Sequence, residues 1–336
     1  MKPRNILLVG PPEYVGMAEG SGYGTRASAI VRRPRGRRRY MVKSWSKYIG
    51  ELRSEVVATA IGKVFGFPVQ EVEPCFIENK VFRDELRLPD DKRAVLIKID
   101  VRKQRDKKNS KNDIEDMKLG TDLLNEVIPG FAEKNPMERR KFITIESVEA
   151  SLNKFEERYP EAKNKIKHQF FLMAIFDAII GGTERHDQNW GVLISLPKNK
   201  FIRLTKFFDN GVSLLWNFEE RESYYKDMLA FGLANSPKFK SFLIKGKSII
   251  RKVVNGEKLN LFELCIILKK RGFIDQEEYT KLKDKLILIK SRPQKLKHAI
   301  VDLVPHDGSF KMTKKELGWI YCNVIGRIEY LISVLP

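Results

Sequence analysis

The sequence predicts an α+β protein in two lobes: a small β-rich lobe over residues 1–101 and a larger, mainly helical lobe over residues 102–336. Short segments rich in Val and Ile gather in the first hundred residues, whereas helical apolar periodicity dominates the remainder. Between them, residues 103–120 are densely charged and nearly free of apolar side chains. Such composition is typical of a surface connection, here with a helix beginning near its end.

One helix is expected among the strands of the N-terminal part. Residues 50–65 place Leu52, Val56, Ala60 and Val64 four positions apart on one helical face. Gly66 and Pro68, which follow, are residues that end helices. The strands are expected at residues 5–9, 27–32, 39–43 and 94–101.

The C-terminal part is predicted to be helical with one β-hairpin, formed by residues 190–196 and 201–208. The hairpin starts where the polar stretch GGTERHDQN ends and finishes at Asp209, so its open end brings two polar clusters together. The helices are expected at residues 145–158, 161–180, 221–233, 258–271, 275–300 and 313–334.

Composition limits the partners and the compartment. The 336 residues include 63 Lys and Arg against 43 Asp and Glu, and the formal charge of +20 favours polyanions, acidic proteins or phosphorylated ligands. Solvated basic helix faces are the alternative. The three cysteines, Cys75, Cys265 and Cys322, lack metal-ligand spacing, which indicates a reducing compartment without structural zinc. No apolar run reaches the roughly 18 residues of a membrane span, so a cytoplasmic protein without a membrane partner is expected.

The polar clusters at the open end of the hairpin are candidates for chemistry. Asn189 and Asp209 would each offer an oxygen to one site, with Glu184 and Asp187 close by. Oxygen ligands of this kind suit Mg²⁺, which keeps several waters and takes further ligands from phosphate. An aspartate before Asn-Gly is by itself more typical of a turn. The joint placement favours phosphoryl transfer.

The N-terminal part supplies a matching series of residues. The stretch GSGYGTR at residues 20–26 is either a loop that brings N–H groups to a phosphate or a plain turn. Lys43 lies on a later strand, and either Glu51 or Glu55 on the helix could pair with it. Glycine loop, lysine, glutamate, asparagine and aspartate follow one another as in protein kinases. The glycines are Gly20, Gly22 and Gly24.

These residues resemble a known family. ERHDQNW followed by FFDNG is similar to the D-R-H-x-x-N-W catalytic loop and the metal-binding aspartate of the HipA-like serine/threonine kinases. Residues 54–73, 120–127 and 170–189 also resemble that family, so the similarity covers most of residues 20–215. The last hundred residues are similar only in being helical.

The resemblance implies a two-lobed protein-kinase-like fold that uses ATP and Mg²⁺. Because the family phosphorylates proteins, in part as toxins of toxin–antitoxin pairs, it also implies a protein hydroxyl as substrate and an antitoxin as partner. The implied sites are Lys43 on the ATP phosphates with Glu55 as its partner, Asn189 and Asp209 on Mg²⁺, His186 as a structural member of the catalytic loop, and an adenine strand near Ile97, Ile99 and Val101.

The chain departs from the family at the catalytic base. Glu184 stands where the family most often has aspartate, and a displacement of about 1 Å can cost on the order of a hundredfold in rate. Three outcomes follow: Glu184 acts as the base, which we favour, Asp187 supplies the carboxylate, or the protein binds nucleotide with little transfer. Asp177, within an apolar run, is expected to be a buried carboxylate bonded to loop backbone.

Further expectations concern regulation and partners. The tip Arg32–Arg39, with sequence RRPRGRRR, is either solvated or a contact for nucleic acid, a nucleic-acid-bound target or an acidic protein. Phosphorylation of Ser21, Thr25 or Ser28 beside the glycine loop would place negative charge where ATP phosphates bind, which would switch activity off. Two alternative functions stay open: an inactive kinase-like module that binds nucleic acid or regulates, and a kinase of lipids or small molecules.

Overall fold

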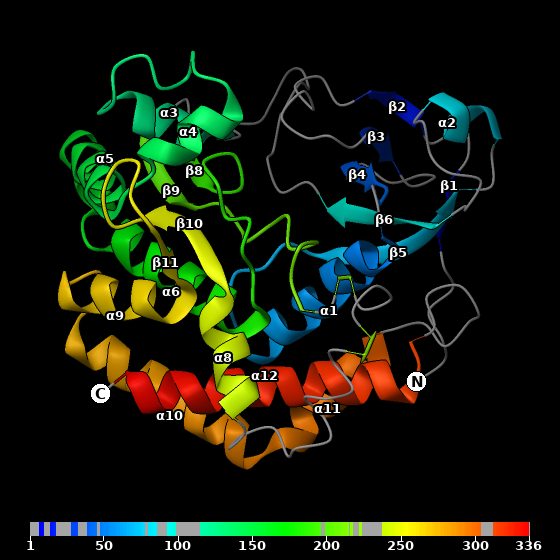
Figure 1. Ribbon diagram of the computed structural model, residues 1–336. Helices are drawn as coiled ribbons and strands as arrows, with labels where there is room; N and C mark the ends of the chain where they lie inside the picture. The colour runs from blue at the N-terminus through cyan, green and yellow to red at the C-terminus, as the bar shows by residue number, and fades with distance from the viewer. Residues whose placement is uncertain are drawn as a thin grey trace. The chain divides into compact units, whose positions relative to one another are not determined.

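The computed structural model describes residues 7–9, 14–17, 28–32, 39–45, 48–77, 80–85, 93–98, 115–195, 199–214, 216–217, 222–223, 237–303 and 312–335. The chain divides into two compact units (Figure 1). Unit 1 comprises Met1–Asp100, Asn210–Phe231 and Arg292–Asn323; unit 2 comprises Val101–Asp209, Gly232–Ser291 and Val324–Pro336. The expected division into lobes at residue 101 stays a prediction.

Unit 1 contains a mixed sheet, in which the described strands follow the order β1-β5-β6-β4-β3-β2. β1 runs parallel to β5, and the other neighbouring pairs are antiparallel. All four strands predicted here are confirmed, as β1, β3, β4 and β6, whereas β2 and the short helix α2 were not predicted. The bounds are β1 Leu7–Val9, β2 Tyr14–Met17, β3 Ser28–Arg32, β4 Arg39–Lys43, β5 Val72–Ile77, α2 Lys80–Glu85 and β6 Arg93–Lys98.

The helix of this unit, α1 (Gly50–Val64), has nearly the predicted bounds. It packs against β5 and β6, and also against α11 (Pro293–Leu303), a later part of the same unit. It is buried on more than the one predicted face, because both the sheet and α11 cover it. Its core contacts with the sheet are made by Ile49, Leu52, Val56, Val72, Val95 and Ile97.

Unit 2 begins, in its described part, with a strand inside the segment that was expected to be a surface connection. β7 (Glu115–Leu119) pairs antiparallel with β8 (Gly191–Ser195), and β8 pairs with β9 (Lys200–Leu204). The hairpin β8–β9 confirms the prediction. The expectation of a helix near residue 120 is met only after β7, because pairing with β8 holds the charged segment extended. The helices that follow β7 are α3 Gly120–Asn125, α4 Pro136–Phe142, α5 Ile145–Arg158, the 3-10 helix η3 Pro160–Ala162 and α6 Lys165–Ile180.

The remaining elements differ from the predictions at three places, one of which is the helix α8 (Pro237–Lys245), which was not predicted. An antiparallel hairpin of β10 (Lys247–Arg251) and β11 (Lys258–Asn260) was not predicted. The single helix expected over 275–300 is interrupted before Pro293, which begins a new helix as proline commonly does. The helix expected over 221–233 lies outside the described residues, apart from 222 and 223. The other helices are α8 Pro237–Lys245, α9 Leu261–Lys270, α10 Gln276–Ser291 and α12 Lys314–Val334.

The helix α12 passes from unit 1 into unit 2 between Asn323 and Val324. Within unit 2, α6 packs against α9 (Figure 1). Among the described helices, none combines the length and the apolar character needed to cross a membrane.

Candidate active site

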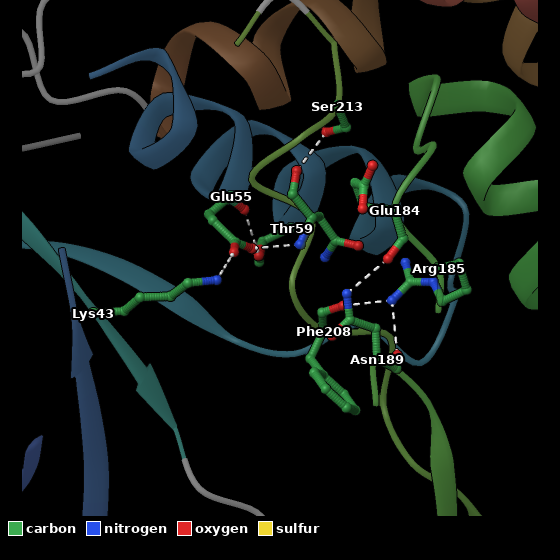
Figure 2. Close-up of polar contacts among 9 residues, drawn as sticks. Lys43, Glu55, Thr59, Glu184, Arg185, Asn189, Phe208 and Ser213 are labelled. Atoms are coloured by element: carbon green, nitrogen blue, oxygen red, sulfur yellow. Dashed lines mark hydrogen bonds and ion pairs between the residues drawn. The ribbon is translucent and has the colours of Figure 1, made fainter. Parts of the chain in front are cut away.

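In unit 1, a buried ion pair joins the sheet to α1. Lys43 lies at the end of β4 and its Nζ is 2.9 Å from Oε1 of Glu55 (Figure 2). The side chains are only 11% and 1% exposed. Of the two glutamates that the sequence offered, Glu55 therefore makes this contact, although Glu51 is buried as well. Such a pair needs both partners, because either charge alone would be buried at high cost.

The second oxygen of Glu55 holds the chain segment that follows Asp209. The backbone N–H of Asn210 donates to Glu55 Oε2 at 3.0 Å. Ser213 Oγ donates to the carbonyl of Asn210 at 2.6 Å, and Ser54 Oγ donates to the carbonyl of Ser213 at 2.9 Å. The segment is thus bonded to α1 at two neighbouring positions, and Glu55 serves both Lys43 and Asn210.

In unit 2, a buried arginine organises the loop that follows α6. The helix ends at Gly181, whose φ of 70° is left-handed. Arg185 then donates to the Asp177 carboxylate from Nε at 3.0 Å and from Nη2 at 2.7 Å. Its Nη1 donates to the carbonyls of Asn189, at 3.0 Å, and of Phe208 (Figure 2). One guanidinium therefore ties α6, the loop and the chain before Asp209 together.

This arrangement corrects the expectation for Asp177. The carboxylate is buried, as predicted, but the described partner is the Arg185 side chain, and it is Arg185 that bonds the loop backbone. Burial raises the pKa of Asp177, and the charge and hydrogen bonds of Arg185 oppose that rise. The sequence did not indicate this pair because the turn at Gly181 brings its members together.

Asn189 is fixed within the same loop. Its Nδ2 donates to the carbonyl of Glu184 at 2.8 Å (Figure 2). Its backbone N–H donates to the carbonyl of His186 at 2.9 Å. With the nitrogen engaged, the amide oxygen is the atom of this side chain that can ligate a cation. Asp209 has a φ of 57°, a conformation that few residues other than glycine adopt and that is concentrated at functional sites.

The two candidate catalytic carboxylates have different surroundings. Asp187 is 2% exposed, accepts from Thr121 Oγ1 at 2.6 Å and lies 3.4 Å from Arg139 Nη1. The Glu184 side chain is 35% exposed, and its Oε2 lies 3.0 Å from Arg140 Nη2. Asp187 thus joins the loop to α3 and α4, while Glu184 has a carboxylate that solvent reaches.

His186 lies partly buried between these groups. Burial lowers its pKa, as does the charge of Arg140, while the carboxylates of Asp187, Asp209 and Glu184 act in the opposite direction. The N–H of Gln188 donates to His186 Nδ1 at 3.3 Å. A neutral imidazole in a hydrogen-bonded turn agrees with the structural role implied by the resemblance, which stays a prediction.

Several predicted site residues cannot be placed. The glycine loop with Gly20, Gly22 and Gly24 lies outside the described residues, as do Ile99 and residues 33–38 of the basic tip. Ile97 is described, on β6, where its side chain belongs to the core against α1. The adenine site and the basic contact therefore stay predictions.

Four residues that contact the loop or the end of α6 were not predicted from the sequence: Thr121, Arg139, Arg140 and Arg327. Arg327 on α12 is buried and donates from Nη1 to the carbonyl of Ala178 at 3.2 Å, in the last turn of α6. A positive charge there also suits the negative end of the helix dipole. The charged run ERRKF in α4 contains Arg139 and Arg140, but such a run is equally typical of a solvated surface and does not by itself predict contacts with the loop.

No protein-family model matches the chain, and no curated protein matches it. Among solved structures, the Helicobacter pylori proinflammatory kinase CtkA has a TM-score of 0.64 at 20% identity, covering 97% of this chain and 93% of that chain. HipA of the Shewanella oneidensis MR-1 toxin–antitoxin system, solved with HipB and operator DNA, has a TM-score of 0.45 at 12% identity, covering 98% and 67%. The similarity to CtkA confirms the predicted α+β, kinase-like fold.

Proposed function

We propose that the protein transfers a phosphoryl group from ATP to a serine or threonine hydroxyl of a protein, with Mg²⁺. The observation that carries the proposal is the buried Lys43–Glu55 pair, whose second carboxylate oxygen accepts the N–H of the residue after Asp209. Protein kinases use a strand lysine held by a helix glutamate to orient the ATP phosphates. The kinase-like fold supports the same function.

The donor atoms fit the proposed cofactor. The Asp209 carboxylate and the Asn189 amide oxygen are hard ligands of the kind that Mg²⁺ prefers. Within the described part of the chain, no group of three or more His, Cys, Asp or Glu side chains is placed to hold a metal ion. Two ligands from the protein, with phosphate and water oxygens for the rest, is a common magnesium pattern. When bound, Mg²⁺ neutralises charge on the transferred phosphate.

Glu184 is the carboxylate that we assign to the acceptor hydroxyl. Its backbone carbonyl is held by Asn189 and His186, so the side chain starts from a fixed position, and its partial exposure leaves room for a substrate. Asp187 is already committed to Thr121 and Arg139 inside the unit. We propose that Asp187 supports the loop and that Glu184 acts on the hydroxyl.

The substrate class and the compartment are proposed from the sequence and the cysteines. A protein acceptor and an antitoxin partner follow from the resemblance of the ERHDQNW loop, and a nucleic-acid contact from the charge of the Arg32–Arg39 tip. Action in the cytoplasm is supported by the free thiols of Cys75, Cys265 and Cys322.

The test is transfer of labelled phosphate from ATP, to the protein itself and to casein. The parent should incorporate label only when Mg²⁺ is present. Asp209→Asn should abolish incorporation, and Glu184→Ala should lower it by about 10²-fold or more, the usual contribution of a general base. Asp187→Ala should lower thermal stability together with activity, and Asp116→Asn, on the exposed edge strand β7, is the matched control.

Absence of labelling in the parent at any Mg²⁺ concentration would contradict the proposal and would favour a regulatory module. Labelling of lipid or small-molecule acceptors in place of protein would instead change the substrate class.

A further inference from the structure

Two consecutive arginines of α4 each contact one of the candidate carboxylates. Arg139 lies 3.4 Å from Asp187 and is buried with it, whereas Arg140 lies 3.0 Å from Glu184, with their side chains 25% and 35% exposed. Successive helical residues project about 100° apart, so a single short helix reaches the loop at two different points. One point is in the core of the unit, and the other is at its surface.

Arg140 is attached to backbone that the β10–β11 hairpin supports. The Arg251 side chain donates from Nε to the carbonyl of Arg140 at 3.1 Å. The backbone N–H of Arg251 donates to the carbonyl of Ile143 at 2.9 Å. The N–H of Asn255 donates to the carbonyl of Lys141 at 3.1 Å. At the other end, Asn135 caps α4 by accepting the N–H of Glu138 at 3.0 Å. The guanidinium of Arg140 therefore extends from a helix that is held at both ends.

Glu184 has a fixed backbone, and its side chain is held only through the Arg140 ion pair among the contacts described. Its carbonyl accepts from Asn189 Nδ2 at 2.8 Å and from the N–H of His186 at 2.8 Å. Glutamate has one more rotatable bond than the aspartate usual at this position, so its carboxylate can occupy more places. Each of those places away from the acceptor lowers the rate, because reacting groups must be aligned to within a fraction of an ångström.

We propose that Arg140 is a positioning residue that holds the longer Glu184 side chain in one orientation. The ion pair occupies Oε2 of Glu184, and Oε1 is the oxygen left to accept the hydrogen bond of an acceptor hydroxyl. The extra methylene and the arginine thus form a matched pair, in which the arginine compensates for the length of the glutamate. This inference rests on the proposed phosphoryl transfer by Glu184.

The test is a double-mutant cycle with Glu184→Asp, because aspartate is one methylene shorter and its carboxylate should lie farther from Arg140. Arg140→Ala should lower kcat about tenfold in the parent and less than about twofold in the Glu184→Asp background. The KM values for ATP and acceptor should stay within about twofold. Arg140→Lys should recover part of kcat, since a single ammonium can still pair with Oε2.

The controls separate positioning from other roles. Lys141→Ala removes a neighbouring exposed positive charge from the same helix and should leave kcat unchanged. An equal loss from Arg140→Ala in both backgrounds would contradict positioning, because it would mean that Arg140 supports the fold or contacts the phosphoryl group directly. Absence of phosphate transfer by the parent would instead contradict the proposed function.

A second readout does not require activity. Crystal structures of the parent and of Arg140→Ala should show the Glu184 carboxylate in one position in the parent and spread over several in the variant. An unchanged, single position of Glu184 in the variant would overturn the inference whatever the kinetics.

Discussion

Glu55 connects three parts of unit 1 through hydrogen bonds and an ion pair. Its carboxylate is almost fully buried, yet both oxygens have partners, Nζ of Lys43 and the N–H of Asn210. Thr59, one turn further along α1, donates to the carbonyl of Glu55 at 3.0 Å. Removing one partner of this buried network would leave a polar or charged group unsatisfied, so the network is stabilising only when all its members are present.

Replacing Glu55 by alanine should lower the free energy of unfolding by about 3 kcal/mol, because the buried Lys43 charge loses its carboxylate. Removing both partners, as in Lys43→Met with Glu55→Ala, should cost less than Glu55→Ala alone. Urea titrations of the parent, of Glu55→Ala, of Lys43→Met and of the double variant measure the free energies of unfolding. Additive losses from the two single changes would show that the pair does not couple.

Asp187 contributes to stability through two buried contacts. Asp187→Ala removes the acceptor of Thr121 and the partner of Arg139, and should lower the free energy of unfolding by about 3 kcal/mol. Thr121→Val, which removes only the hydroxyl, should cost about 1 kcal/mol. Denaturant unfolding checks both, and a stable Asp187→Ala protein that has lost only activity would return Asp187 to the role of base.

At the scale of elements, the junction of α6 with the loop depends on one glycine. Gly181 has a left-handed φ of 70°, and a Cβ there would lie 2.8 Å from Nη2 of Arg327. Gly272, after α9, has a φ of 73°, and a Cβ there would have no heavy atom of the described residues within 4 Å. The two glycines share the same backbone conformation but differ in their neighbours.

Gly181→Ala should therefore destabilise the protein more than Gly272→Ala. The control carries only the cost of the left-handed conformation, about 1 kcal/mol, while Gly181→Ala also displaces Arg327 from the end of α6. Thermal unfolding measures the stabilities, and phosphate transfer should fall only in Gly181→Ala. Equal effects of Gly181→Ala and Gly272→Ala in both assays would mean that Arg327 can move away without disturbing the loop.

The attachment of β9 to η3 gives a pH-dependent prediction. Glu161 accepts the N–H of Phe201 at 2.8 Å, and the hydrogen bonds from its own backbone N–H and from that of Phe201 hold its pKa below the ordinary value. Because the folded pKa is the lower one, the stabilisation is present above the ordinary pKa and is lost as the pH falls below it. The stability difference between the parent and Glu161→Gln should shrink between about pH 6 and about pH 3.5. Denaturant titrations at the two pH values check this, and a constant difference would contradict it.

Elements with strong periodicity or a clear turn could be predicted from the sequence. The hairpin β8–β9 has β-rich strands around Pro-Lys-Asn-Lys, and α1 has a regular apolar face and a glycine at its end. β7 could not be predicted, because EDMKL carries little apolar pattern and its strand conformation comes from pairing with β8. The hairpin β10–β11 was missed for a similar reason, since its short strands lie between helical patterns.

The site was predictable in its residue types and less so in its contacts. The order of the strand and the helix predicted a partner for Lys43 on the helix but left Glu51 and Glu55 open, and the resemblance favoured Glu55. The arginines of α4 could not be assigned to the loop, since their contacts depend on how α4 packs within unit 2. Charge alone did not distinguish Arg139, which is buried, from the exposed Lys141 two residues later.

On the scale of the whole molecule, neither unit is a continuous piece of chain. Unit 1 combines residues 1–100 with two later segments, and these segments contribute to its interior. Trp216 lies edge-on to Tyr48 with ring centroids 5.3 Å apart, and Glu316 lies 2.9 Å from Arg53. The N-terminal strands and α1 therefore depend on residues that are synthesised much later.

A fragment of residues 1–101 should not fold cooperatively, because α1 would lose α11, Trp216 and the hydrogen bond from Ser54 to Ser213. Circular dichroism during heating should show a gradual change, in contrast to the full chain. A sharp transition in the fragment would mean that the first hundred residues form an independent domain.

The shared carboxylate of Glu55 has a thermodynamic consequence. A ligand that drew Lys43 away from Oε1 would alter the charge with which Oε2 holds the N–H of Asn210. If the proposed nucleotide binds Lys43, its binding and the ordering of residues 210–213 are therefore linked equilibria. Linkage is reciprocal: a ligand of that segment whose affinity the proposed nucleotide changes would change the affinity for the nucleotide by the same factor. A partner protein that bound only residues 210–213 would thereby act as an effector of ATP binding without touching the nucleotide.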